Sequence, residues 1–172
     1  MSIQNPPRVK LICAVTFAPR IKLDDIMFSL ERAFGMVDSK SPVIAFDHTD
    51  YYQAEMGPDL KKTILSFDYA FKPEDLWIAK RTAIDIESVF AKDGKRGINL
   101  DPGYLETSKL VLASTKNFSH RVYLNEGIYA EITLIFADGK FQKLPWTYPD
   151  YLDKNIFDFL TKTREGLKNN LR

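Results

Sequence analysis

The chain has 172 residues, of which 45% are hydrophobic and 27% charged, which is the composition of a soluble globular protein of about one domain. Its 24 basic and 23 acidic residues leave a net charge of +1, so the composition gives no clear signal for nucleic acid. Cys13 is the one cysteine and excludes an intramolecular disulfide, and the absence of an N-terminal apolar leader or a long apolar run leads us to expect a cytoplasmic protein and no membrane span.

The first half of the chain alternates predicted strands and helices. A nearly continuous apolar run at 11–17 predicts a central strand that is covered on both faces. The pattern of 23–35 predicts a helix, with Asp24 and Asp25 in its first turn and Gly35 at its end. Further strands are expected at 41–47 and 61–71, with a long polar loop at 48–58 between them.

The second half begins with a helix that opens at Pro73 and Glu74 and carries an apolar stripe. A strand is expected at 98–100, while 107–114 fits either a short helix or a strand. Turn signals at 125–127 and 138–139 then predict two successive hairpins. A helix follows, which Asp153 is expected to cap.

The order of these elements predicts an α+β fold. Its first six elements match the ferredoxin-like β-α-β-β-α-β pattern, extended by an antiparallel β-meander and a C-terminal helix. We expect the helices on one face of a mostly antiparallel sheet. Residues 1–172 contain no long linker and no repeat, which predicts a single domain.

The segment 99–124, NLDPGYLETSKLVLASTKNFSHRVYL, is the first candidate site. Its basic side chains suit a phosphate or carboxylate, because lysine supplies a point charge and arginine a two-pronged donor. The predicted ligand-binding residues are Lys109, Thr115, Lys116, Arg121 and Tyr129. His120 is the predicted proton carrier, with Asp101 and Glu131 orienting it or acting as acid and base. Alternatively, the segment is structural, and His120 and Arg121 pair with Glu131 on the neighbouring strand.

Strand alternation sharpens this hypothesis. In the middle strand of the meander, one face is expected to carry the apolar residues Ile128, Ala130, Ile132, Leu134 and Phe136. Tyr129, Glu131 and Thr133 would then line the opposite face. Pairing across the first hairpin would place Arg121 and Tyr123 beside Glu131 and Tyr129.

Two further segments are candidates of other kinds. The loop FDHTDYYQAEMG gathers Asp47, His48, Asp50 and Glu55, whose oxygen and imidazole ligands suit a divalent metal. The loop that contains Arg20 and Lys22 is expected at the same end of the sheet. The connector LPWTYPDY carries Trp146, Tyr148 and Tyr151, which either stack on a ligand or pack the last helix onto the sheet.

The chain resembles a known bacterial family through several long motifs. These are NLDPGYL, SKLVLASTK, the hairpin HRVYLNEGIYAEITL, LPWTYPDY and the segment 49–62. The family is domain of unknown function 4416, and the resemblance implies no established activity, substrate, cofactor or catalytic residue. Some members carry a loose label of GTP binding, but this sequence contains neither G-x-x-x-x-G-K-[ST] nor G-x-G-x-x-G.

Three functions therefore remain open from the sequence. The leading one is binding of a small anionic ligand, such as a phosphate or a nucleotide-like molecule, at 99–124. The alternatives are a non-catalytic protein-interaction module and a metal-dependent hydrolase. No G-x-S-x-G, H-E-x-x-H or C-x-x-C motif supports a particular enzyme class or cofactor, and the oligomeric state is open.

Overall fold

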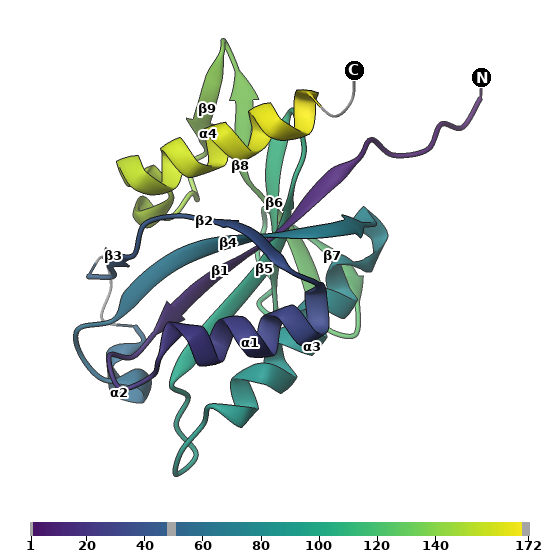
Figure 1. Cartoon of the computed structure of the whole chain (residues 1–172). Coiled ribbons are helices and arrows are strands. Elements are labelled where there is room, and N and C mark those ends of the chain that lie inside the picture. The colour runs from purple at the N-terminus through teal and green to yellow at the C-terminus, as the bar shows by residue number, and fades with distance from the viewer. Residues whose placement is uncertain (1, 48–50, 170–172) are drawn as a thin grey trace.

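The computed structural model describes residues 2–47 and 51–169, which form one antiparallel sheet and its covering helices (Figure 1). The strands described are β1 (Val9–Phe17), β2 (Val37–Lys40), β3 (Ile44–Ala45), β4 (Lys61–Phe71), β5 (Ile98–Leu105), β6 (Lys109–Ser114), β7 (Arg121–Asn125), β8 (Ile128–Ala137) and β9 (Lys140–Lys143). The helices described are α1 (Leu23–Phe34), α2 (Gln53–Met56), α3 (Leu76–Val89) and α4 (Lys154–Asn169), with short 3-10 turns η1 (Pro73–Asp75) and η2 (Pro149–Leu152). This mixture of helix and antiparallel sheet confirms the α+β class.

The strand order is β2-β4-β1-β5-β6-β8-β7, with β3 added to β4 and β9 added to β8. All strand pairings within the described residues are antiparallel. β1 lies between β4 and β5, and its residues are buried along almost its whole length. This confirms that the apolar run of β1 is a central strand, because both of its faces are covered.

The prediction that the helices share one face of the sheet is wrong. Alternate residues of β1 belong to two separate cores: Leu11, Cys13 and Val15 pack with α1 and α3, whereas Ile12 and Ala14 pack with α4. Figure 1 shows α1 and α3 close together and α4 apart from them, near β8 and β9. Helices therefore cover both faces, and Cys13 is a fully buried core residue, as the sequence predicted.

Local signals predicted most helix ends correctly. α1 carries Asp24 and Asp25 in its first turn and ends at Gly35, whose φ of 86° suits glycine and whose N–H donates to the Glu31 carbonyl. The predicted strand at 41–47 is mostly wrong: only β3, Ile44–Ala45, lies within it, and β2 ends before it at Lys40. Pro42, between β2 and β3, cannot donate a ladder hydrogen bond. The segment predicted as a polar loop contains α2 within its described part, 51–58.

The structure resolves the open assignment in the middle of the chain and corrects the end of one predicted strand. Residues 109–114 form strand β6, and β5 continues past the predicted end at Leu100 to Leu105. Pro102 is tolerated inside β5 because β5 pairs with β1 alone until Gly103, where β6 joins it. No helix in the described part of the chain is long and apolar enough to cross a membrane.

Both predicted hairpins are present, but the regular alternation expected in β8 is not. The pairing of β6 with β8 shifts between Leu110 opposite Leu134 and Val111 opposite Ile132, so that Thr133 is an extra residue, a β-bulge. Ile128 and Ala130 face the α1 and α3 core, whereas Leu134 packs in the α4 core with Leu112, the partner of Glu131. The prediction that Ile128, Ala130, Ile132, Leu134 and Phe136 share one face is therefore wrong, and Ile132 is 42% exposed.

Candidate functional site

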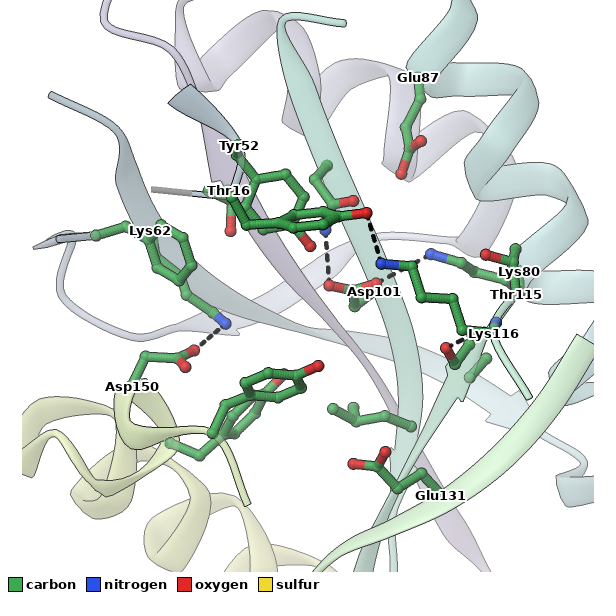
Figure 2. A pocket seen from close by; sticks show the side chains of 18 of the residues that line it. Thr16, Tyr52, Lys62, Lys80, Glu87, Asp101, Thr115, Lys116, Glu131 and Asp150 are labelled. Carbon is green, nitrogen blue, oxygen red and sulfur yellow. Dashed lines mark hydrogen bonds and ion pairs between the residues drawn. The ribbon is translucent and has the colours of Figure 1, made fainter. Parts of the chain in front are cut away.

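A cavity of about 560 Å³ lies where β5 and β6 separate. The two strands pair only from Gly103 to Leu105 and from Leu110 to Leu112. Beyond this short ladder, Asn99 and Asp101 of β5 and Ser114 of β6 line the cavity, as Figure 2 shows for Asp101. Side chains of β1, β4, α3, β7, β8 and η2, together with several loop residues, complete its wall. The volume is within the range of pockets that bind small organic molecules.

Asp101 holds the centre of the cavity wall. Lys80 of α3 donates to Asp101 Oδ1 over 3.0 Å and to the Leu100 carbonyl over 2.6 Å, and Asn99 donates to Asp101 Oδ2 over 2.7 Å. Burial favours the neutral form of Asp101, but the Lys80 ammonium and Lys62 outweigh it and lower the pKa of this carboxyl. Burial likewise disfavours the charged form of Lys80, yet Asp101 and Glu87 raise its pKa. Both members of the pair are therefore charged at neutral pH.

Arg96 extends this network toward the outside. Its guanidinium donates to both oxygens of Glu55 over 2.7 and 2.8 Å, to Glu87 Oε2 over 3.2 Å and to Asn99 Oδ1 over 3.1 Å. The other oxygen of Glu87 accepts the Leu100 N–H over 2.6 Å. The hydrogen bonds from Arg96 lower the pKa of Glu55, whereas burial raises the pKa of Glu87.

A second ion pair in the cavity wall joins distant parts of the chain. Lys62 of β4 pairs with Asp150 of η2, and both side chains are at most 5% exposed (Figure 2). The Lys62 ammonium also lies over the rings of Tyr151, at 4.4 Å, and Phe46, at 5.4 Å. The pair therefore ties the connector before α4 to the sheet.

Glu131 of β8 organises the opposite wall. Arg121 Nε donates to Glu131 Oε2 over 2.8 Å, His120 Nε2 lies 3.0 Å from the same oxygen, and Thr133 donates to Glu131 Oε1. The register places Arg121 opposite Glu131 and Tyr123 opposite Tyr129, as predicted from the hairpin. His120 stacks on Trp146, with ring centroids 4.6 Å apart, beside a smaller hollow adjoining the cavity.

Lys116 differs from the other cations of the cavity. Within the described residues, Lys62, Lys80, Arg96 and Arg121 each contact a carboxylate, whereas Lys116 donates to the Tyr51 hydroxyl over 2.6 Å. Its backbone carbonyl accepts from Arg121 over 2.9 Å. Ser114 and Thr115 line the same cavity beside it, and the Ser114 hydroxyl accepts the Lys116 N–H over 3.2 Å.

The structure thus gathers part of the predicted site. Asp101, Glu131, Thr115, Lys116 and Arg121 line one cavity. His120 does not line this cavity, but it contacts Glu131 and lines the smaller hollow beside the cavity. Lys109 pairs with Glu106, and Tyr129 packs on Tyr123 with centroids 5.5 Å apart, and neither residue lines the cavity.

The predicted metal ligands do not form a cluster in the described residues. No group of three or more His, Cys, Asp or Glu side chains in that part of the chain could hold a metal ion. Asp47 is exposed, and Glu55 is bound to Arg96, while His48 and Asp50 lie outside the described residues. The predicted neighbourhood of the two loops is present, since Arg20 donates to the Met56 carbonyl over 3.0 Å.

Sequence reasoning missed Lys62, Lys80, Arg96 and Asp150 as cavity residues. Lys62 carries a usable signal, because strand alternation places it on the same face as the apolar Ile64. Lys80 carries one as well, since helical spacing places it next to the apolar stripe of Leu76 and Ala83. No local pattern joins Arg96 or Asp150 to the site, because each reaches it from a loop or a 3-10 turn.

The fold and site define an α+β protein with a small-molecule-sized cavity that contains several buried ion pairs. A family model described as a domain of unknown function, DUF4416, matches residues 7–166, and the chain belongs to this family. No curated protein and no solved structure matches it.

Proposed function

We propose that the cavity binds a small anionic molecule, with the anion held by Lys116 and the neighbouring hydroxyls of Thr115 and Ser114. The observation that carries this proposal is the partner of Lys116, a tyrosine hydroxyl and not a carboxylate, which an anion can replace or join. The remaining lining cations in the described residues are neutralised by carboxylates, so they favour a polar wall over a second anion site.

The charged wall supports binding over a purely structural role. Burying charged side chains is costly, and replacing buried ion pairs by apolar residues is often neutral or stabilising. A cavity that retains Lys62, Lys80 and Glu131 at 5% exposure or less is better explained by a polar ligand than by stability. Acid–base roles for His120, Asp101 and Glu131 remain a prediction, since both carboxylates already accept from cations.

For the fold, we infer the ferredoxin-like arrangement within one domain. The order β2-β4-β1-β5 places the first and third strands of the predicted β-α-β-β-α-β unit at its centre, which supports this assignment. The sheet continues from β5 into β6, β8 and β7, which supports treating residues 1–172 as one unit.

A thermal-shift screen with nucleotides, phosphate esters, simple anions and divalent metals tests the binding proposal. A ligand at 100 times its Kd stabilises the folded state by about 2.7 kcal/mol, which raises the Tm by about 5–11 °C. We expect this shift in the native protein, its loss in Lys116→Ala, and its retention in Lys140→Ala, which removes an exposed lysine from the second hairpin. A phosphate-induced shift that persists in Lys116→Ala would contradict the assignment of Lys116.

The alternative of a protein-interaction module has its own supporting observation. Strand β7 lies at the end of the sheet and exposes Val122 and Tyr123 at 69% and 57%, with Phe118 nearby at 63%. Such an edge can pair with another strand. A flat ligand screen together with a captured partner that Val122→Lys releases would favour this function instead.

A further inference from the structure

Tyr151 is the most deeply buried aromatic residue of the cavity wall. It belongs to η2, is 2% exposed, and packs in the same core as Ile156 and Leu160 of α4. Its ring lies below the Lys62 ammonium, next to the Lys62–Asp150 pair. The packing fixes the ring, so the position of its hydroxyl is fixed as well.

The hydroxyl of Tyr151 has no hydrogen-bond partner among the described residues. Its charged neighbours in the wall are all bonded: Lys62 to Asp150, Lys80 to Asp101, and Glu131 to Arg121. A buried hydroxyl that bonds to nothing in the protein destabilises the folded state relative to phenylalanine at the same position. Such exceptions in otherwise satisfied structures call for a specific explanation.

The hydroxyl is also fixed in its protonated form. Burial, with the carboxylates of Asp150 and Asp101, holds the pKa of Tyr151 well above its ordinary value. A neutral phenol can donate a hydrogen bond, and the surrounding carboxylates penalise a phenolate.

Resting on the function proposed above, we propose that the Tyr151 hydroxyl selects the ligand of the cavity by donating to an acceptor atom on it. The flat rings of Phe46, Tyr52 and Tyr148 line the same cavity, which favours a planar body. The ligand class is therefore an organic acid or phosphate ester whose acidic group binds at Lys116. Its unsaturated body carries a carbonyl oxygen or ring nitrogen that binds Tyr151.

The first test needs no ligand. Tyr151→Phe removes only the hydroxyl, so the variant without added ligand should have the Tm of the native protein or one up to about 4 °C higher. Tyr69→Phe, at a position that is 56% exposed, is the matched control and should not change the Tm. A fall of more than about 2 °C in Tyr151→Phe alone would assign the hydroxyl a structural bond and overturn the proposal.

The second test compares benzoate with the three pyridine carboxylates, which share its shape and charge but add a ring nitrogen at three positions. Titration by ligand-observed NMR should show at least one pyridine isomer binding the native protein about 3- to 10-fold more tightly than benzoate. This advantage should vanish in Tyr151→Phe, while benzoate affinity is unchanged.

The outcomes separate the two proposals. If all four acids bind equally well, or the advantage survives in Tyr151→Phe, the role of Tyr151 is wrong while the anion site stands. If Lys116→Ala binds all four acids as the native protein does, or none of them binds the native protein, the anion site fails and the selection by Tyr151 fails with it.

Discussion

At the scale of single residues, Gly103 determines how the cavity begins. It is the first residue of β5 that pairs with β6, and a Cβ atom there would overlap the Val111 carbonyl oxygen and the Leu112 side chain. The two strands therefore approach as closely as backbone allows at this point and separate on one side of it. Glycine is required here for close approach, not for an unusual φ.

We expect Gly103→Ala to lower the free energy of unfolding by about 1–3 kcal/mol, since the added methyl group forces neighbouring backbone to move. Urea unfolding followed by circular dichroism measures this change. Gly166→Ala is the matched control, because a Cβ atom at this position in α4 meets nothing within 4 Å. Alanine should stabilise that helix by up to about 1 kcal/mol. Equal effects of the two substitutions would show that the strands do not meet as closely as described.

The residue scale also shows what the sequence could predict of the site. Residue type alone predicts Thr115 and Lys116 as anion-binding residues, and the register of the hairpin predicts that Arg121 lies opposite Glu131. Asp150 could not be found in this way, since its partner Lys62 is 88 positions away and no periodicity connects them. Such pairs depend on how α4 returns to the sheet, which local patterns do not encode.

At the scale of elements, the bulge in β8 has two consequences. Past the extra residue, the side chains that would have pointed to one face of the sheet point to the other. Simple alternation therefore predicted a single apolar face incorrectly. The bulge also leaves the carbonyls of Ile132 and Thr133 able to accept from Trp146 Nε1, over 2.8 Å, and from Thr147 Oγ1, over 2.6 Å. The bulge thereby anchors the aromatic connector that carries Asp150 and Tyr151 into the cavity.

Thr147→Val should reveal the strength of this anchor. The near-isosteric change removes the donor to Thr133 and the acceptor for the Leu144 N–H, so we expect a loss of about 1–3 kcal/mol in unfolding free energy. Thr161→Val removes a hydroxyl that only back-bonds to the Phe157 carbonyl within α4, and should change stability by less than about 0.5 kcal/mol. If both valine variants unfold at the same urea concentration, the hydrogen bonds of Thr147 do not anchor the connector.

At the scale of the whole molecule, helices cover both faces of the sheet. This explains why the sequence of the central strand is almost continuously apolar. The sequence predicted this strand and the α+β class correctly. It did not predict that α4 covers the second face, because an amphipathic helix indicates that it packs on something but not on which face.

Leu160→Ala tests whether this second core belongs to one cooperative unit. Leu160 is fully buried in α4, and its truncation should cost about 2–5 kcal/mol, whereas Leu152→Ala, at 41% exposure, should cost less than about 0.5 kcal/mol. Trp77 packs against the α1 and α3 core, and Trp146 lies in the connector. Fluorescence and circular dichroism should therefore report one coincident transition. Separate fluorescence and circular dichroism transitions in Leu160→Ala would show that the two cores unfold as two units.

The Lys62–Asp150 pair has a consequence for synthesis of the chain on the ribosome. The 88 positions between its members take about 4–18 s to translate at ordinary rates of elongation. During that interval β1 and β4 can pair and α1 can dock, but Asp150, the carboxylate that binds Lys62 on the face that α4 will later cover, has not yet been made. The nascent sheet must therefore keep that face hydrated until the connector emerges, so the cavity is completed among the last events of folding.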